Sequence, residues 1–183
     1  MQTNHTQESY ARPADFYSGV PGKGLVLMGL VGLVSGVLAS TQTDTRSWLL
    51  IWLVASAIGF GTGVVAMFLK SIRAGVPFLH DPLRRFAFSL APALGVATLL
   101  TIILFRHGDA GLLPGVWLLL YGAGIVAAGI YAIRLIPLMG LCFMGLGHLV
   151  FASPAEWGDW FLLAGFGGLH IFFGVIIWRK HGG

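Results

Sequence analysis

The chain has 183 residues, of which 56% are hydrophobic and only 10% are charged. Soluble domains carry roughly 25% charged residues, so this composition excludes an ordinary soluble domain. The formal net charge of +4 does not predict a nucleic-acid partner, because the basic residues flank apolar runs and do not form one patch. The single cysteine, Cys142, excludes an intrachain disulfide and a thiolate cluster, and we expect no metal site.

Six apolar segments are of the length that crosses a bilayer, since a hydrocarbon core about 30 Å thick takes about 20 helical residues. They comprise residues 24–39, 48–69, 86–105, 112–133, 135–152 and 160–178. Every Asp and Glu lies outside them, and strands with open edges would leave amides unpaired in lipid. We therefore predict an all-α fold, a polytopic membrane helical bundle with six transmembrane helices. The fourth and fifth segments are divided only by Arg134 and Pro137, where the chain must turn.

The basic residues predict the orientation of the bundle. If the amino terminus is cytoplasmic, nine Lys and Arg residues lie on the inner side, and only Arg46 and Arg106 lie outside. This positive-inside bias predicts that both termini are cytoplasmic, in a cell inner (plasma) membrane. The chain then has a polar amino-terminal tail over 1–22, a transmembrane domain over 23–178 and a basic carboxyl-terminal tail over 179–183.

The first apolar segment has a second interpretation. Lys23, the apolar run 25–37 and the small-residue end at Ala39 also fit a secretory signal that is cleaved. Because a polar leader of 22 residues precedes the charge, which is longer than usual for a signal, we expect the helix to be retained.

Glycine is expected to bring the helices together, because helices in lipid associate through close backbone approach and not by hiding Leu from water. Gly32 and Gly36 form one four-residue pair in the first segment. Ala55, Gly59 and Gly63 form a longer stripe in the second segment, which we predict to be the main packing face. The stripe would face either a neighbouring helix or a second copy of the chain.

A short sequence echo also has two interpretations. The pattern Pro-Gly-x-x-Leu-x-Leu-x-Gly begins at both Pro21 and Pro114. Three crossings separate the two copies, so they would be inverted, as in the repeats of many transporters. Because the chain is rich in Gly and Leu, we expect chance alignment to explain the echo.

Two histidines, His148 and His170, lie inside the predicted spans. Counted from the outer ends of their helices, they lie at depths of about 6 and about 15 Å, which argues against one haem held between them. A single-ligand haem or a quinone at His170 is one interpretation. We expect instead a neutral imidazole bonded to a carbonyl or hydroxyl across a helix interface.

Several functions are disfavoured by what the spans lack. They contain no carboxylate, which argues against a proton-driven antiporter or a sodium-coupled carrier. They contain no Gly-x-Ser-x-Gly elbow, no His-Glu-x-x-His site and no pair of aspartates, so we predict no catalytic residues.

One region remains as a candidate site, at mid-membrane depth. Glycine clusters over 59–63 and 165–168 expose backbone that could bind a solute, although tight helix packing would explain them as well. The predicted ligand-binding residues are Ser56, Gly59, Gly61, Thr62, Gly63, Gly165, Gly167 and His170.

The sequence therefore predicts a non-enzymatic bundle, either channel- or transporter-like or solute-binding, for a small neutral solute. We expect no cofactor, and partners limited to the lipid bilayer and either further copies of the chain or a membrane complex. The alternative is a membrane anchor or accessory subunit of a larger complex, such as a respiratory one, with haem or quinone near His170.

Overall fold

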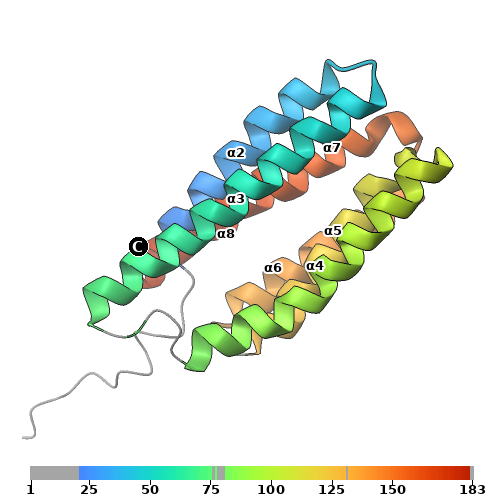
Figure 1. Cartoon of the computed structure of the whole chain (residues 1–183). Coiled ribbons are helices and arrows are strands. Elements are labelled where there is room, and N and C mark those ends of the chain that lie inside the picture. Colours follow the sequence, from blue (N-terminus) through green and yellow to red (C-terminus); the bar gives the residue numbers. More distant parts are fainter. Residues whose placement is uncertain (1–20, 76, 78–80, 131, 182–183) are drawn as a thin grey trace, which may run out of the picture.

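The structure is a computed structural model that describes residues 21–75, 77, 81–130 and 132–181, and every regular element in this part is helical (Figure 1). The main helices are α2 (Gly22–Ser40), α3 (Thr45–Ala74), α4 (Asp81–His107), α5 (Leu113–Gly129) and α6 (Leu135–Phe151). The last rod comprises α7 (Gly158–Leu162), the π-helix η3 (Leu163–Leu169) and α8 (His170–His181). The short 3-10 turns η1 (Ala110–Leu112) and η2 (Ala155–Trp157) precede α5 and α7. Residues 1–20 of the predicted amino-terminal tail lie outside the described part.

Five of the helical segments are long and apolar enough to cross a membrane. They are Gly22–Ser40, Thr45–Arg73, Leu83–His107, Ala110–Gly129 and Ala155–Lys180. The remaining helix, α6, has 17 residues and spans about 26 Å at 1.5 Å per residue. The prediction of an all-α fold is confirmed for the described residues, and so is the turn between the fourth and fifth segments, whereas the sixth crossing and the orientation stay predictions.

Local signals fix both ends of α3, the longest helix. The Asp44 carboxylate accepts hydrogen bonds from the backbone N–H and the hydroxyl of Ser47, each 3.0 Å long, and caps the helix. These hydrogen bonds hold the pKa of Asp44 below its ordinary value. At the other end Gly75 has φ +67°, a left-handed conformation that favours glycine and stops the helix.

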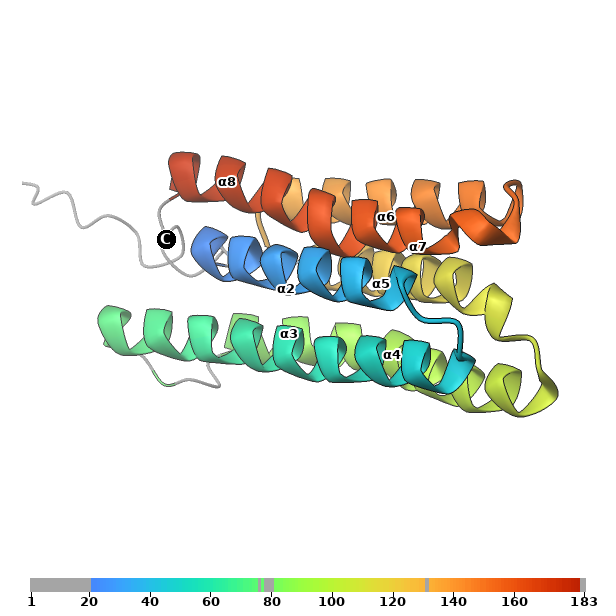
Figure 2. The ribbon, with the colours of Figure 1, turned by 90° about the horizontal axis from the view of Figure 1, so that it is seen from above.

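The helices form two layers of three. In one layer α2 lies between α3 and α8, and in the other α5 lies between α4 and α6 (Figure 2). The layers are joined mainly on one side, where the last rod packs against α5 and α6. In the described part of the chain, no comparable backbone contact joins α3 to α4. The bundle is therefore closed along one side and parted along the other (Figure 1).

Glycines lie at the closest helix approaches within each layer. A Cβ placed on Gly29 of α2 would lie 2.8 Å from the Gly167 carbonyl oxygen of the last rod. Between α5 and α6, a Cβ on Gly122 would lie 2.6 Å from the Gly140 carbonyl oxygen, and one on Gly140 would lie 2.7 Å from that of Gly122. A larger residue at these positions would force the helices apart.

The packing face predicted at Ala55, Gly59 and Gly63 is interrupted at Gly59, although Ala55 is buried, with 6% exposed. That the stripe faces a second copy of the chain stays a prediction. A Cβ added to Gly59 would meet no atom within 4 Å, and one on Gly63 would reach only the Met28 sulfur at 3.4 Å, an ordinary contact. The prediction of Gly59 as a tight packing position is wrong, because this part of α3 faces a space between the layers and not another backbone.

The two glycines that begin the echo after Pro21 and Pro114 pack differently. In an inverted three-plus-three repeat, α2 matches α5, α3 matches α6 and α4 matches the last rod. Gly22 packs against the last rod, at Gly174 and Trp178, whereas its match Gly115 packs against Phe151 of α6. The matched glycines therefore serve different interfaces, but the helix order is the one that the repeat requires, because α2 lies between α3 and the last rod as α5 lies between α6 and α4. Both interpretations of the echo stay open.

Candidate functional site

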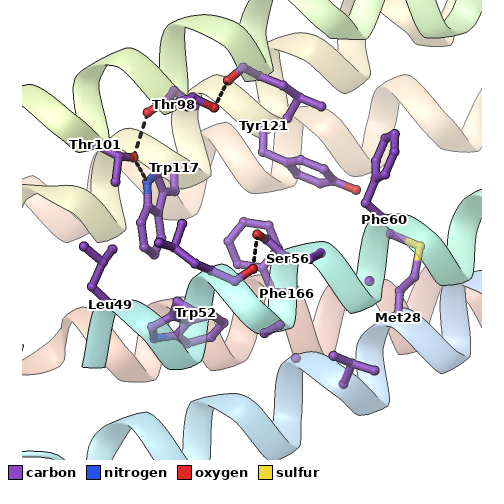
Figure 3. A pocket seen from close by; sticks show the side chains of 18 of the residues that line it. Met28, Leu49, Trp52, Ser56, Phe60, Thr98, Thr101, Trp117, Tyr121 and Phe166 are labelled. Atoms are coloured by element: carbon purple, nitrogen blue, oxygen red, sulfur yellow. Dashed lines mark hydrogen bonds between the residues drawn. The ribbon is translucent and has the colours of Figure 1, made fainter. Parts of the chain in front are cut away.

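A cavity of about 780 Å³ lies between the two layers, on the side where α3 and α4 part (Figure 3). Its walls come from α2, α3, α4, α5, η3 and the first residue of α8. Six of the lining side chains are large aromatic rings: Trp52, Phe60, Phe105, Trp117, Tyr121 and Phe166. Drug-sized ligands and cofactors occupy pockets of about 300–1,000 Å³, so the cavity has the volume of a binding site.

Three of the eight residues predicted for the site line this cavity, namely Ser56, Gly59 and His170. Gly61, Thr62 and Gly63 follow on α3 but do not line the cavity. Gly63 lies on the same face as Gly59, one helical turn further along, where a Cβ would lie 3.4 Å from the Met28 sulfur of α2. The Thr62 hydroxyl donates to the Ile58 carbonyl oxygen of the same helix, at 2.8 Å.

The other two predicted residues, Gly165 and Gly167, lie in η3 but outside the cavity lining. A Cβ on Gly165 would lie 2.5 Å from Leu118, and one on Gly167 would lie 2.5 Å from Leu33. These glycines let η3 approach both layers closely. Phe166 between them lines the cavity, so within the predicted glycine cluster the site residue is the aromatic one.

His170 is 2% exposed and both of its ring nitrogens have partners. Nδ1 lies 3.1 Å from the Phe166 carbonyl oxygen and Nε2 lies 2.8 Å from the Tyr121 hydroxyl. A carbonyl only accepts, so Nδ1 carries the proton and Nε2 accepts from the tyrosine. The bond to Tyr121 joins the two layers, because α5 supplies the hydroxyl.

Tyr121 is a site residue that sequence reasoning missed. Its ring lies 4.9 Å from Phe143 and 5.3 Å from Phe166, each edge to face. A tyrosine hydroxyl at mid-span needs a hydrogen-bond partner, and this was the signal that could have linked it to His170. Phe166 and His170 are four residues apart and lie on the same side of the rod, where their rings are nearly parallel, with centroids 6.2 Å apart.

His148 takes no part in the site. It is exposed on α6, and its Nδ1 lies 3.0 Å from the Met144 carbonyl oxygen of the same helix. Among the described residues, no group of three or more His, Cys, Asp or Glu side chains could hold a metal ion.

A chain of contacts between tryptophans bounds the cavity at the end where α3 begins. Trp48 donates to the Asp159 carboxylate of α7 at 2.6 Å and stacks on Trp117, with ring centroids 5.6 Å apart and planes 6° from parallel. Trp117 in turn donates to the Thr101 hydroxyl of α4 at 2.8 Å. These contacts join helices of both layers around one end of the cavity, which we call the tryptophan end.

The remaining polar groups of the lining are few. Ser56 donates to the Leu53 carbonyl oxygen at 2.8 Å and Thr98 to that of Leu94 at 2.9 Å, so both hydroxyls use their protons on their own helices (Figure 3). Trp52 is 4% exposed, and its indole Nε1 has no hydrogen-bond partner in the part of the chain that the structure describes. Arg106, close to the end of α4, is the one charged residue of the lining.

We compared the chain with protein-family models, with curated proteins and with solved structures, and found no match in any of the three. The site must therefore be interpreted from its own geometry.

Proposed function

We propose that this protein is a non-enzymatic, membrane-embedded binding protein whose cavity between α3 and α4 takes an uncharged, weakly polar molecule. The observation that carries the proposal is the cavity itself: about 780 Å³, six large aromatic side chains and no carboxylate in its lining. An environment of this kind favours apolar surface with a few oriented hydrogen bonds and disfavours ions, whose desolvation costs several kcal/mol.

The proposal includes the wider arrangement expected from the sequence. We place the chain in the inner membrane with six crossings and both termini in the cytoplasm, supported by the positive-inside bias of its basic residues. We further propose that the bundle passes the bound molecule across the membrane, as a channel or a carrier does. It would associate either with further copies of itself or with a membrane complex.

The alternative of an accessory subunit with haem at His170 has less support. Both ring nitrogens of His170 are hydrogen-bonded, so iron ligation at Nε2 would require Tyr121 to leave. A quinone fits the same cavity without that change, since it is an uncharged lipophile and needs no metal ligand.

A pair of glycine substitutions on α3 tests whether the cavity binds a molecule. Gly59 lines the cavity and Gly61 does not, and a Cβ on either residue would meet no atom within 4 Å. Both Leu variants should therefore fold, but only Gly59→Leu places a side chain in the site. Native mass spectrometry after purification in mild detergent measures the molecules that remain bound.

We expect wild type and Gly61→Leu to retain the same bound lipophile, and Gly59→Leu to lose most of it. Ala97→Phe, which fills the cavity from the α4 wall, should repeat the loss. Equal retention by all four proteins would refute the proposed function.

A further inference from the structure

We infer that the cavity takes one lipid in an extended form, with its apolar chain along the gap between α3 and α4 and its uncharged head at the tryptophan end, beside Arg106. This inference rests on the proposed function and names the ligand class: an uncharged acyl lipid whose ester oxygens accept hydrogen bonds. Arg106 is then the residue that binds the head and sets the direction of the lipid.

The cavity is elongated along the helix axes. Its lining on α4 runs from Leu90 to Arg106, which is about 24 Å at 1.5 Å per residue, and its lining on α3 runs from Leu49 to Phe60, which is about 16 Å. One leaflet supplies half of a hydrocarbon core about 30 Å thick. The cavity therefore has the length of a lipid chain that stands in one leaflet, and a compact solute would leave part of it empty.

Polarity falls along the cavity in the direction in which it falls along a lipid. Arg106, the one charged residue of the lining, lies one residue before the end of α4. The opposite part is lined by apolar side chains such as Phe60 and Leu90, and there Tyr121 and His170 are hydrogen-bonded to each other. A polar head at the tryptophan end and an apolar chain toward Leu90 match this order, because each part of the lipid then meets surface of its own polarity.

The Arg106 guanidinium has donors to offer to a head. Among the described residues no hydrogen bond or ion pair uses it, and its side chain is exposed beside the cavity. In the predicted orientation Arg106 lies on the outer side, so the positive-inside rule gives no reason for a cation there. A guanidinium carries its N–H donors in a planar fork, which suits the two oxygens of an ester.

The charges around Arg106 favour an uncharged head over an anionic one. At the tryptophan end the chain turns between α2 and α3, between α4 and α5 and between α6 and α7 (Figure 1). These turns and the helix ends beside them carry two guanidinium groups against four carboxylates: Arg46, Arg106, Asp44, Asp109, Glu156 and Asp159. An anionic head would meet a surplus of negative charge, whereas an ester meets no such repulsion.

The opening of the cavity faces the acyl chains of the bilayer. Exposed side chains of the lining lie on α3 and α4, including Leu53 at 44%, Phe60 at 61% and Ile102 at 50%. Leu53 and Phe60 lie eight and fifteen residues into α3, which is about 12–22 Å from its start and within the depth of the hydrocarbon. A lipid can therefore enter sideways from its leaflet, with its chain already extended and its head already at the level of Arg106.

Photo-crosslinking with two lipids tests this assignment. Both probes are palmitoyl monoacylglycerols, and they differ only in whether a diazirine lies next to the ester or at the end of the chain. Each probe is added to the protein in lipid nanodiscs, and the labelled residues are identified by mass spectrometry. The probe with the diazirine next to the ester should label the lining near Ile102 and Phe105, and the other probe should label it near Phe60 and Leu90.

Residues on the outer face of α4 are the control for labelling by bulk lipid. Val96 and Leu99 are exposed and adjoin Ala97 and Thr98 along the helix, but they do not line the cavity. An excess of unmodified monopalmitoylglycerol should abolish labelling of the lining, because a binding site saturates, and should leave labelling of Val96 and Leu99 largely unchanged. Labelling of the lining that is equal for both probes, or reversed between them, would overturn the inference.

Arg106 and Arg46 form a matched pair of variants for the head. Both residues lie at the tryptophan end, but only Arg106 lines the cavity. Arg106→Ala removes the donors and should weaken monopalmitoylglycerol about two- to tenfold in competition with the probes, whereas Arg46→Ala should not. Equal affinities of the two variants would overturn the role of Arg106.

The charge of the head is tested with a second competitor. Palmitoyl lysophosphatidic acid has the same chain and glycerol as monopalmitoylglycerol but carries an anionic phosphate. It should compete less well for wild type, because of the carboxylates around Arg106. Tighter binding of the phosphate would overturn the inference of an uncharged head.

The outcomes separate this inference from the proposed function. If Gly59→Leu loses the molecule that copurifies with wild type, but the two probes label the lining without order or without saturation, the cavity binds lipophiles and the inference is wrong. If neither probe labels the lining saturably, and wild type, Gly59→Leu and Gly61→Leu retain the same molecules, the proposed function fails as well.

Discussion

Trp52 and His170 meet the same physical problem in different ways. Each places an N–H donor at the depth of the hydrocarbon, where no water is available as an acceptor. His170 solves it within the chain, through the Phe166 carbonyl and the Tyr121 hydroxyl. The Trp52 N–H has no such partner among the described residues, and leaving a buried donor unpaired costs about 1–3 kcal/mol.

Removing the Tyr121 hydroxyl tests how much its hydrogen bond to His170 stabilises the fold. Tyr121→Phe leaves the buried Nε2 of His170 without a donor, so we expect the free energy of unfolding to fall by about 1–3 kcal/mol. Titration with a denaturing detergent measures the change. Thr98→Val is the control, because that exposed hydroxyl bonds only its own helix, and it should change the free energy by less than about 0.5 kcal/mol. Equal values for both variants would contradict a structural role for the Tyr121–His170 bond.

At this scale the sequence allowed part of the site to be predicted. Ser56, Gly59 and His170 were found because glycine and polar residues stand out in an apolar span. Tyr121 and Trp52 were not found, because each matters through residues from other helices, and His170 lies 49 positions from Tyr121. Spacing along one helix carries no information about such a pairing.

Among the elements, α3 and α5 use their glycines for different purposes. The glycines of α5 bring backbones together, as at Gly122 against Gly140. Gly59 of α3 faces open space and keeps the cavity wide. Spacing alone made Ala55, Gly59 and Gly63 resemble a packing face, because four-residue repeats of small residues occur on helix faces of either kind.

The two kinds of glycine should respond in opposite ways to a larger side chain. Gly122→Leu must separate α5 from α6, and we expect it to lower the free energy of unfolding by roughly 3 kcal/mol or more. Gly59→Leu meets no atom near its Cβ and should change stability by less than about 0.5 kcal/mol. The same detergent titration compares them. A greater fall in the free energy of unfolding for Gly59→Leu than for Gly122→Leu would support the packing face predicted from the sequence.

In the whole molecule, contact between the layers is uneven. The last rod closes one side, and the tryptophan end ties α3, α4, α5 and α7 together at one extremity. Helix number and approximate bounds followed from hydropathy, since the cost of burying polar groups in lipid acts on each segment alone. The layer order did not follow, because apolar side chains cover every face of these helices and leave no stripe that identifies a neighbour.

The bond at the tryptophan end should contribute to the joining of the layers. Asp159→Ala removes the acceptor of Trp48 and should lower the free energy of unfolding by about 1–2 kcal/mol, since the bond is charged but only half-buried. Asp159→Asn keeps an acceptor and should lose less. Glu156→Ala, at an exposed neighbour, is the matched control and should have little effect. If Glu156→Ala lowers the free energy of unfolding as much as Asp159→Ala does, the effect comes from removing a negative charge and not from losing the hydrogen bond of Trp48.

The central claim is that the two layers part between α3 and α4 to hold a lipophilic molecule, and an experimental structure of the protein in lipid nanodiscs tests it most directly. We predict a cavity of about 780 Å³ between the layers, with density for a bound molecule inside it. A structure in which α3 packs directly on α4 and leaves no space for a bound molecule would contradict it.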